Sequence, residues 1–181
     1  MENSVICASV GIVFSLITMI SLAWHTFQLG ISPMPSSAKA RRAIVEIVKS
    51  QNPRTNIAEL GSGWGGLAIS LARVVSGGRV VGYERSLVPY LWSQFAAKVV
   101  RVRNLTLLRD DFHRAQLRDF DIVVCYLFTG AMEKLRKKFE QELKPGALVI
   151  SNTFAVPGWK PIEVIRLEDL YKTPIYVYRA D

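Results

Sequence analysis

Short apolar runs alternate with longer amphipathic stretches from residue 57 to the C-terminus. The runs predict seven strands, at residues 57–60, 79–83, 105–108, 122–126, 147–152, 163–167 and 175–178. The stretches predict helices at 66–75, 87–100 and 131–143, with a short irregular piece at 112–117. This order predicts an α/β fold in which a mostly parallel, doubly wound seven-stranded sheet ends in a hairpin.

A further helix is predicted ahead of the first strand, from residue 38 to about residue 49. Ser36 or Ser37 can cap its first turn. The stretch before it reads GISPMPSS, whose prolines and serines are typical of a linker. We therefore divide the chain into an N-terminal segment at 1–30, a linker and pre-core helix at 31–55, and an α/β domain at 56–181.

The N-terminal segment contains an apolar stretch at residues 5–24, VICASVGIVFSLITMISLAW, with no charged residue. About 20 helical residues cross a hydrocarbon core of about 30 Å, and Trp24 stands where an interfacial aromatic is expected. A cleaved signal peptide usually begins with basic residues, whereas this chain begins Met1-Glu2-Asn3. A helix buried in a soluble core normally carries a polar stripe. The segment therefore predicts one transmembrane helix that anchors the protein.

Charge is confined to the part of the chain after this segment. All 23 basic residues and 14 of the 15 acidic ones lie from Lys39 onward, so this part carries a net charge of +9. Its first basic cluster is Lys39, Arg41 and Arg42, which predicts a single-pass protein with its body on the cytoplasmic or mitochondrial matrix side. Anionic lipid head groups, worth up to ~1 kcal/mol per basic residue, are a simpler partner for such a body than nucleic acid.

The composition excludes several classes of protein. Half of the residues are hydrophobic and 21% are charged, which is typical of a folded domain and not of a disordered chain. The two cysteines, Cys7 and Cys125, cannot form a disulfide framework. No Cys/His cluster has the spacing of zinc ligands, so we expect no metal site.

The most informative motif joins the first predicted strand to the helix after it. Residues 57–66 read IAELGSGWGG, which fits both the dinucleotide pattern G-x-G-x-x-G and the pattern acidic-x-G-x-G-x-G of methyltransferases that use S-adenosylmethionine. Glycines there allow a tight turn and a close approach of the backbone to a nucleoside-bearing ligand. Glu59 favours the second pattern, because a carboxylate attracts an ammonium or sulfonium group and repels a pyrophosphate.

Acidic residues also end the next two predicted strands. Glu84 lies 19 residues beyond Gly65, a distance at which an acid can accept hydrogen bonds from both hydroxyls of a ribose. Asp111 and Phe112 follow the third strand, where a carboxylate and an aromatic ring can recognise adenine. The carboxyl ends of parallel strands meet at one edge of a sheet, so these residues predict a single nucleoside-binding crevice.

Six other segments carry a resemblance to a known family: PMPSS at 33–37, VPYLWS at 88–93, DIVVCYLF at 121–128, LKPG at 143–146, SNTF at 151–154 and PGWKP at 157–161. With the glycine motif, they make the domain resemble the Rossmann-like class I methyltransferases that use S-adenosylmethionine. Within that class it is similar to the small protein-lysine methyltransferases. That group includes archaeal broad-specificity enzymes and membrane-anchored mitochondrial enzymes that modify the ATP synthase c-subunit or the adenine nucleotide translocase.

The resemblance implies roles for individual residues. The methionine portion of the cofactor would lie at Glu59 and the glycine loop, the ribose at Glu84, and the adenine at Asp111 and Phe112. The implied cofactor-binding residues are Glu59, Gly61, Ser62, Gly63, Gly65, Glu84, Asp111, Phe112 and Tyr126. The implied residues of the substrate channel are Tyr126, Asn152, Phe154 and Trp159. The family often has histidine and an acid where this chain has Asn152-Thr153, so no general base is assigned.

The expected function is that of a membrane-anchored enzyme that transfers methyl groups from S-adenosylmethionine to lysine side chains of proteins. Methylation of a membrane lipid or lipophilic small molecule is an alternative, as is a non-catalytic, membrane-tethered cofactor-binding module. A nicotinamide-dependent oxidoreductase is disfavoured, because the sequence has no Tyr-x-x-x-Lys pair. Methyl transfer displaces a leaving group at a sulfonium carbon, so the protein must align and desolvate a nucleophile. A lysine must first lose its proton.

Overall fold

A computed structural model of the protein describes Gly11 and residues 36–181. The predicted transmembrane helix and most of the linker lie outside the described residues. The chain divides into two compact units, Met1–Met34 and Pro35–Asp181, and the second contains the α/β domain. Within the described residues, we find no helix that combines the length and apolar character needed to cross a membrane.

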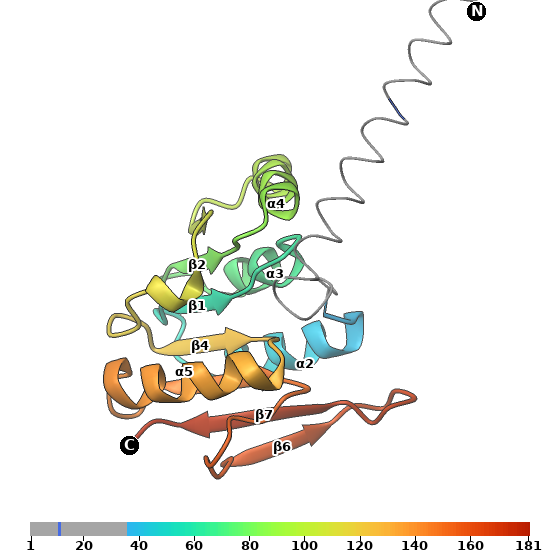
Figure 1. Ribbon diagram of the computed structural model, residues 1–181. Helices are drawn as coiled ribbons and strands as arrows, with labels where there is room; N and C mark the ends of the chain where they lie inside the picture. Colours follow the sequence, from blue (N-terminus) through green and yellow to red (C-terminus); the bar gives the residue numbers. More distant parts are fainter. Residues whose placement is uncertain (1–10, 12–35) are drawn as a thin grey trace, which may run out of the picture. The chain divides into compact units, whose positions relative to one another are not determined.

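The domain is built on one seven-stranded sheet. Its strands are β1 (Ile57–Leu60), β2 (Val80–Tyr83), β3 (Leu105–Leu108), β4 (Ile122–Cys125), β5 (Leu148–Asn152), β6 (Glu163–Arg166) and β7 (Pro174–Arg179). They lie in the order β3-β2-β1-β4-β5-β7-β6 (Figure 1). β1 to β5 are parallel, and β7 is antiparallel to both β5 and β6. The mostly parallel sheet and its terminal hairpin are therefore confirmed.

The helices are α2 (Ala38–Lys49), α3 (Gly66–Val74), α4 (Leu87–Val100) and α5 (Thr129–Glu142), with a short 3-10 helix, η1 (Phe112–Arg114). Every strand and α-helix predicted for residues 36–181 is present, with ends within two residues of those expected. Ser37 caps α2, since its Oγ accepts a hydrogen bond of 3.1 Å from the backbone N–H of Ala40. The capping prediction is thus confirmed for the second of the two serines.

Two hydrophobic clusters cover the two faces of the sheet. On one face, side chains of α2 and α3 pack against the central strands, as Ile44 and Leu71 do. On the other face, α5 and the segment after η1 pack against the same strands, as Leu135 and Leu117 do. The helices thus form layers on opposite sides of the sheet (Figure 1). The central strands β1, β2, β4 and β5 are buried along their whole length, as expected for parallel strands covered on both faces.

The chain order creates a switch point in the middle of the sheet. From β1 the chain builds outward through β2 to β3, and it then returns to place β4 on the opposite side of β1. The loops that follow β1 and β4 therefore lead in opposite directions. In open α/β sheets this arrangement leaves a ligand-binding crevice beyond the carboxyl ends of the two strands.

Candidate functional site

Predicted site residues from three strands meet at this switch point. Leu60 at the end of β1 pairs with Tyr83 of β2 and with Cys125 of β4. The residues that follow these three are Gly61, Glu84 and Tyr126. A Cβ atom on Gly61 would lie 3.1 Å from Cδ2 of Leu127, so the loop after β1 runs close to the end of β4. The structure therefore brings the glycine loop, Glu84 and Tyr126 to one edge of the sheet.

The glycine loop needs its glycines for both conformation and space. Gly61 and Gly65 have φ angles of 78° and 77°, in the left-handed region. A Cβ on Gly65 would also stand 2.6 Å from the Cβ of Ser93 on α4, closer than two carbon atoms can approach. The backbone N–H groups of Gly61 and Ser62 both donate to the carbonyl of Tyr83, at 2.9 Å each. The loop is thus tied to the end of β2.

Glu84 holds the loop in place from the other side. Its Oε2 accepts a hydrogen bond of 2.8 Å from the backbone N–H of Gly63, and its Oε1 accepts one of 2.7 Å from Ser86. The residue is buried, with 8% of its surface exposed. A carboxylate can accept about four hydrogen bonds, so these two leave capacity for ribose hydroxyls. The ribose role of Glu84 stays a prediction, and the structure adds a role in positioning the loop.

Two polar atoms of the motif are buried without a partner. Among the described residues, the buried side-chain nitrogen and oxygen atoms that lack a hydrogen bond are Oε2 of Glu59 and Oγ of Ser62. Burial, and then the nearby charge of Glu84, raise the pKa of Glu59 well above its ordinary value, against the lowering effect of the Ala68 backbone N–H. Unpaired buried oxygens are costly. Glu59 lies in the last half of β1 and Ser62 in the loop after it, a place that fits a ligand with hydrogen-bond donors and positive charge.

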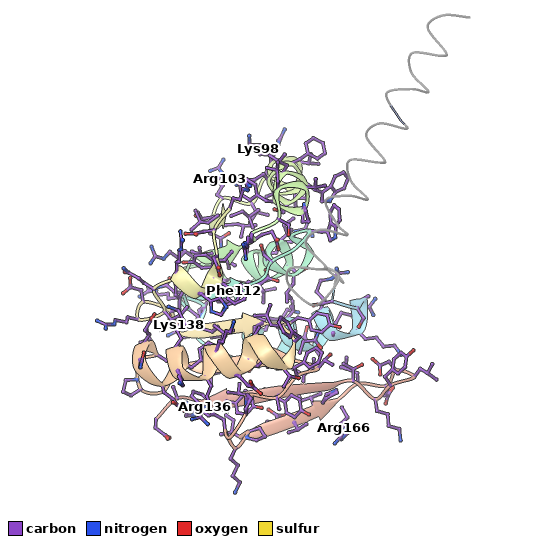
Figure 2. The ribbon with its side chains drawn as sticks, in the orientation of Figure 1. Lys98, Arg103, Phe112, Arg136, Lys138 and Arg166 are labelled. Carbon is purple, nitrogen blue, oxygen red and sulfur yellow. The ribbon has the colours of Figure 1, made fainter. Side chains whose placement is uncertain are left out.

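Asp111 and Phe112 come shortly after β3, the strand next to β2 in the sheet. Asp111 caps η1, since its Oδ1 accepts a hydrogen bond of 2.9 Å from the backbone N–H of His113. Phe112 is half-buried against the α5 side of the core, and its ring centroid lies 4.5 Å from that of His113 (Figure 2). The capping bond fixes the backbone that presents Phe112. Their predicted contact with adenine stays a prediction.

The ends of β4 and β5 form the other half of the site. Cys125 pairs with Ser151, which brings Tyr126 beside Asn152. The rings of Tyr126 and Phe154 stack at 6.2 Å with an interplanar angle of 25°. Asn152 is buried, and its Nδ2 donates to Oγ of Ser36 at 3.4 Å. Three of the four predicted substrate-channel residues therefore lie together.

Trp159, the fourth, has different neighbours. Its ring packs against Phe139 at 6.1 Å and Tyr178 at 6.0 Å, and its Nε1–H donates to Oε1 of Glu140 at 3.2 Å. These contacts attach it to α5 and β7, so they give Trp159 a packing role. Its predicted contact with substrate stays a prediction that the packing does not favour.

A strained backbone turn at Thr153 has no counterpart in the sequence analysis. Thr153 has a φ angle of 68°, and the N–H of Phe154 donates to the carbonyl of Asn152 at 2.8 Å across it. A hydrogen bond from residue i+2 to residue i around a positive φ is the strained form of the γ-turn. A β-branched residue in this region costs about 1–3 kcal/mol. The SNTF segment contains no glycine, so the sequence does not predict such a turn.

Arg41 is a second residue that the sequence analysis did not associate with the site. A Cβ on Gly66, the first residue of α3, would lie 3.0 Å from Nη1 of Arg41. The guanidinium of α2 therefore reaches the start of α3. In the sequence, Arg41 reads only as part of a basic cluster after the linker. Its placement depends on the packing of α2 against α3, for which the sequence carries no local signal.

Comparisons with known proteins agree with this geometry. Residues 59–163 match the family model described as the ANTKMT methyltransferase domain. A protein-lysine N-methyltransferase from Saccharolobus islandicus (strain REY15A) is 30% identical over 138 residues, which span 75% of this chain and 84% of that protein. The lysine N-methyltransferase of the ATP synthase c-subunit from Rattus norvegicus is 31% identical over 132 residues. These span 71% of this chain but only 59% of the rat protein.

Solved structures share the fold. The crystal structure of an RNA methyltransferase from Salinibacter ruber in complex with S-adenosyl-L-homocysteine aligns with a TM-score of 0.72 at 25% identity, over 81% of this chain and 93% of that one. No group of three or more His, Cys, Asp or Glu side chains that could hold a metal exists within residues 36–181. The family match spans more than half of the chain. This protein therefore belongs to the ANTKMT methyltransferase family, a group of class I enzymes that use S-adenosylmethionine.

Proposed function

We propose that this methyltransferase acts on lysine side chains of protein substrates, and that residues 5–24 anchor it in a membrane. The observation that carries the proposal is the group of side chains gathered at the switch point. It combines the unpaired buried oxygens of Glu59 and Ser62 with the stacked rings of Tyr126 and Phe154. A lysine substrate is supported by the archaeal and rat relatives, both of which are named as lysine N-methyltransferases.

The glycine-loop half of the crevice would hold the cofactor. When bound, S-adenosylmethionine supplies a methyl carbon activated by its sulfonium. The carboxyl group of Glu59 would neutralise the positive charge of the methionine portion, and the lone pairs of Glu84 not used by the loop would accept from the ribose. Asp111 and Phe112 would bind the adenine. This assignment pairs the buried, partnerless oxygen of Glu59 with a positively charged group.

Arg41 would bind the carboxylate end of the cofactor. Arginine beside the start of α3 is electrostatically unfavourable on its own, because a helix N-terminus carries partial positive charge. An anion between the two is attracted by both the guanidinium and the backbone N–H groups of the first turn. The α-carboxylate of S-adenosylmethionine is such a group. Docking of α2 against α3 would then help to form the cofactor site.

The β4–β5 half would receive the lysine. Stacked aromatic rings can line a channel for the aliphatic part of a lysine and exclude water around its amino group. Both ends of the Asn152 amide are already engaged, Nδ2 with Ser36 and Oδ1 with the hydroxyl of Thr153. Asn152 would therefore position the segment before α2 rather than accept the proton of the substrate. Alignment of the amine with the methyl carbon is then the main contribution of the protein.

Labelling with the full chain tests the substrate class. The protein is incubated with methyl-labelled S-adenosylmethionine and a lysate of its source that includes membranes, and label is measured in protein, lipid and RNA. Label recovered as methyl-lysine is the expected result. Label in lipid, or in RNA as the name of the S. ruber enzyme suggests, would overturn it. Cofactor binding without any label would identify a non-catalytic module.

Two matched variants test whether the label depends on this site. Glu84→Gln should abolish the label, because an amide has one acceptor oxygen and cannot keep the hydrogen bonds from both Gly63 and Ser86. Glu46→Gln is the control, since Glu46 is an exposed acid on α2 paired with Lys49. Equal labelling by both variants would place the activity elsewhere.

Membrane anchoring is tested by fractionation of cells. The proposal rests on the uncharged stretch 5–24 and on the basic cluster Lys39, Arg41 and Arg42, which favours the cytoplasmic or matrix side. The full chain should stay in the membrane pellet after a high-salt wash. A variant that lacks residues 1–30 should be released by the same wash, with its cofactor affinity intact. Salt release of the full chain, or salt-resistant pelleting of the shortened one, would contradict the anchor.

A further inference from the structure

Helix α4 presents its large apolar side chains to solvent. The five exposed ones are Leu87 (42% exposed), Leu91 (55%), Trp92 (55%), Phe95 (59%) and Val99 (64%). At about 100° per residue they fall within a sector of about 140° of the helix surface. The rings of Trp92 and Phe95 lie 6.1 Å apart. We call this surface the α4 stripe.

The inner side of α4 buries no large apolar side chain completely. Its buried residues are Pro89 and Ser93, and Ser93 lies against Gly65 of the glycine loop. Gln94 donates from Nε2 to the carbonyl of Leu107 on β3 at 2.9 Å. No residue of α4 belongs to either hydrophobic cluster of residues 36–181. A helix of a soluble domain normally turns its apolar face to the core, so the reversed arrangement indicates an external apolar partner.

The segment that contains the α4 stripe is basic. Residues 85–109 contain no Asp or Glu and five basic residues, all exposed: Arg85, Lys98, Arg101, Arg103 and Arg109. None of the ion pairs found among the described residues involves them. Figure 2 shows Lys98 and Arg103 at the same end of the domain, by α4. The partner of this surface should therefore be apolar inside and negatively charged at its margin.

We propose that the α4 stripe docks the domain onto an anionic lipid bilayer. An interfacial helix of this kind buries its apolar side chains at the boundary of the acyl chains, while flanking basic residues contact head groups. A second copy of the chain is disfavoured, because pairing two stripes would bring five positive charges against five others. The docking requires neither a lysine substrate nor a helix that spans the membrane.

Docking through the α4 stripe would also orient the active site. α4 begins three residues after Glu84, and Ser93 packs against Gly65. The helix is therefore in direct contact with the proposed cofactor loop. A domain held by α4 would keep its crevice at the membrane surface, within reach of sites that lie close to the bilayer.

Tryptophan quenching in the full chain tests the proposal. The protein is reconstituted with vesicles of brominated phosphatidylcholine alone, or with 30% brominated phosphatidylglycerol. Trp92→Phe removes one of the four tryptophans, and Trp159→Phe removes another that packs on α5 and serves as the control. We expect Trp92→Phe to lose the quenching that depends on anionic lipid and Trp159→Phe to keep it. Equal anionic-lipid quenching in Trp92→Phe and the wild type would overturn the proposal.

A second variant separates charge from apolar contact. Lys98→Gln with Arg101→Gln leaves every tryptophan in place and should lower the ratio of docked to undocked α4 about fivefold per charge removed. Retained cofactor binding, measured by calorimetry, verifies the fold of each variant. Unchanged quenching in this variant would overturn the proposal. Protection of Trp92 from aqueous iodide without vesicles, together with dimers in sedimentation, would overturn it in favour of a second copy.

Discussion

The two halves of the proposed site differ in how their buried polar atoms are paired. In the cofactor half, formed by the glycine loop and Glu84, buried carboxyl groups include an oxygen without a partner. In the acceptor half, formed by the ends of β4 and β5, the buried polar groups are paired within the protein, and two aromatic rings stack beside them in the sequence. Unpaired polar atoms fit a charged ligand, whereas a satisfied apolar wall fits a nucleophile that must lose its water.

The comparison predicts that variants of the two halves fail in different ways. Changes in the cofactor half should weaken cofactor binding, and the rate should fall as a result. Changes in the acceptor half should lower the rate with cofactor affinity unchanged. A variant of one half that behaves like the other would break the distinction.

The largest effect is expected for Glu84→Ala. The change removes the hydrogen bond from Gly63, which fixes the glycine loop, and the one from Ser86, which fixes the start of α4; each is charge-assisted and worth about 1.5–3 kcal/mol. Cofactor affinity measured by calorimetry should fall about 100-fold or more. Glu46→Ala, at an exposed site on α2, should leave the affinity unchanged. Wild-type affinity in Glu84→Ala would remove this residue from the cofactor half.

Phe154→Ala is the matching test of the acceptor half. Loss of the ring that stacks on Tyr126 opens the apolar wall and loosens the alignment of the amine. The rate of methyl transfer at saturating cofactor should fall about 10- to 100-fold. The dissociation constant of the cofactor should stay within about twofold of the wild-type value. A larger loss of cofactor affinity than of rate would contradict the division.

Glu59→Gln should separate binding from stability. The raised pKa of Glu59 means that the folded protein takes up a proton, so unfolding free energy falls as pH rises from the ordinary value of 4.5 toward the raised one. Glutamine removes this loss and should raise Tm in the ligand-free protein at pH 8. Cofactor affinity should fall about tenfold, since the neutral amide attracts a cation less. In the wild type, affinity should rise with pH through the same window; a flat profile would contradict a cationic partner.

Local signals in the sequence predicted much of the cofactor half. A glycine run between an apolar strand and a helix specifies a tight turn whatever surrounds it, and the acids at 59, 84 and 111 lie in or after the ends of strands that must meet. The structure adds contacts between distant segments. Ser93 of α4 leaves no room for a side chain at residue 65, and Arg41 of α2 reaches Gly66. Both contacts depend on how α4 and α2 pack against the start of α3.

Features that depend on tertiary packing were not predictable. The apolar residues of α4 predicted a helix correctly, but apolar periodicity does not say whether the apolar side meets the core, and here it meets solvent. The packing of Trp159 on Tyr178 could not be predicted from the sequence either, and its contact with substrate stays a prediction. The turn at Thr153 is imposed by β7, because Pro174 accepts the Thr153 N–H at 2.8 Å.

Thr153→Asn probes the strain stored in the acceptor half. Asparagine tolerates the left-handed region better than a β-branched residue, so the substitution should stabilise the protein by about 0.5–1 kcal/mol. That gain corresponds to a rise in Tm of about 1–4 °C for a domain of this size. Thr153→Val keeps the branched side chain and should show no gain. A lower Tm in Thr153→Asn would mean that the hydrogen bond from Thr153 Oγ1 to Asn152 outweighs the strain.

The smallest effect is expected at Cys125, at the border of the two halves. Its thiol is 1% exposed at the end of β4, and burial raises its pKa to about 12. At pH 8 only about one thiol in 10,000 is then ionised, and the thiolate is the reactive form. In a Cys7→Ser background, the native protein should therefore consume no maleimide within an hour, and the unfolded protein should consume one equivalent. Protection should be the same with and without cofactor, because the thiol is shielded by packing against Met132 and Val149 rather than by the ligand. Rapid labelling that cofactor suppresses would instead show that solvent reaches Cys125 in the ligand-free protein. The acceptor half could not then exclude water from the amine.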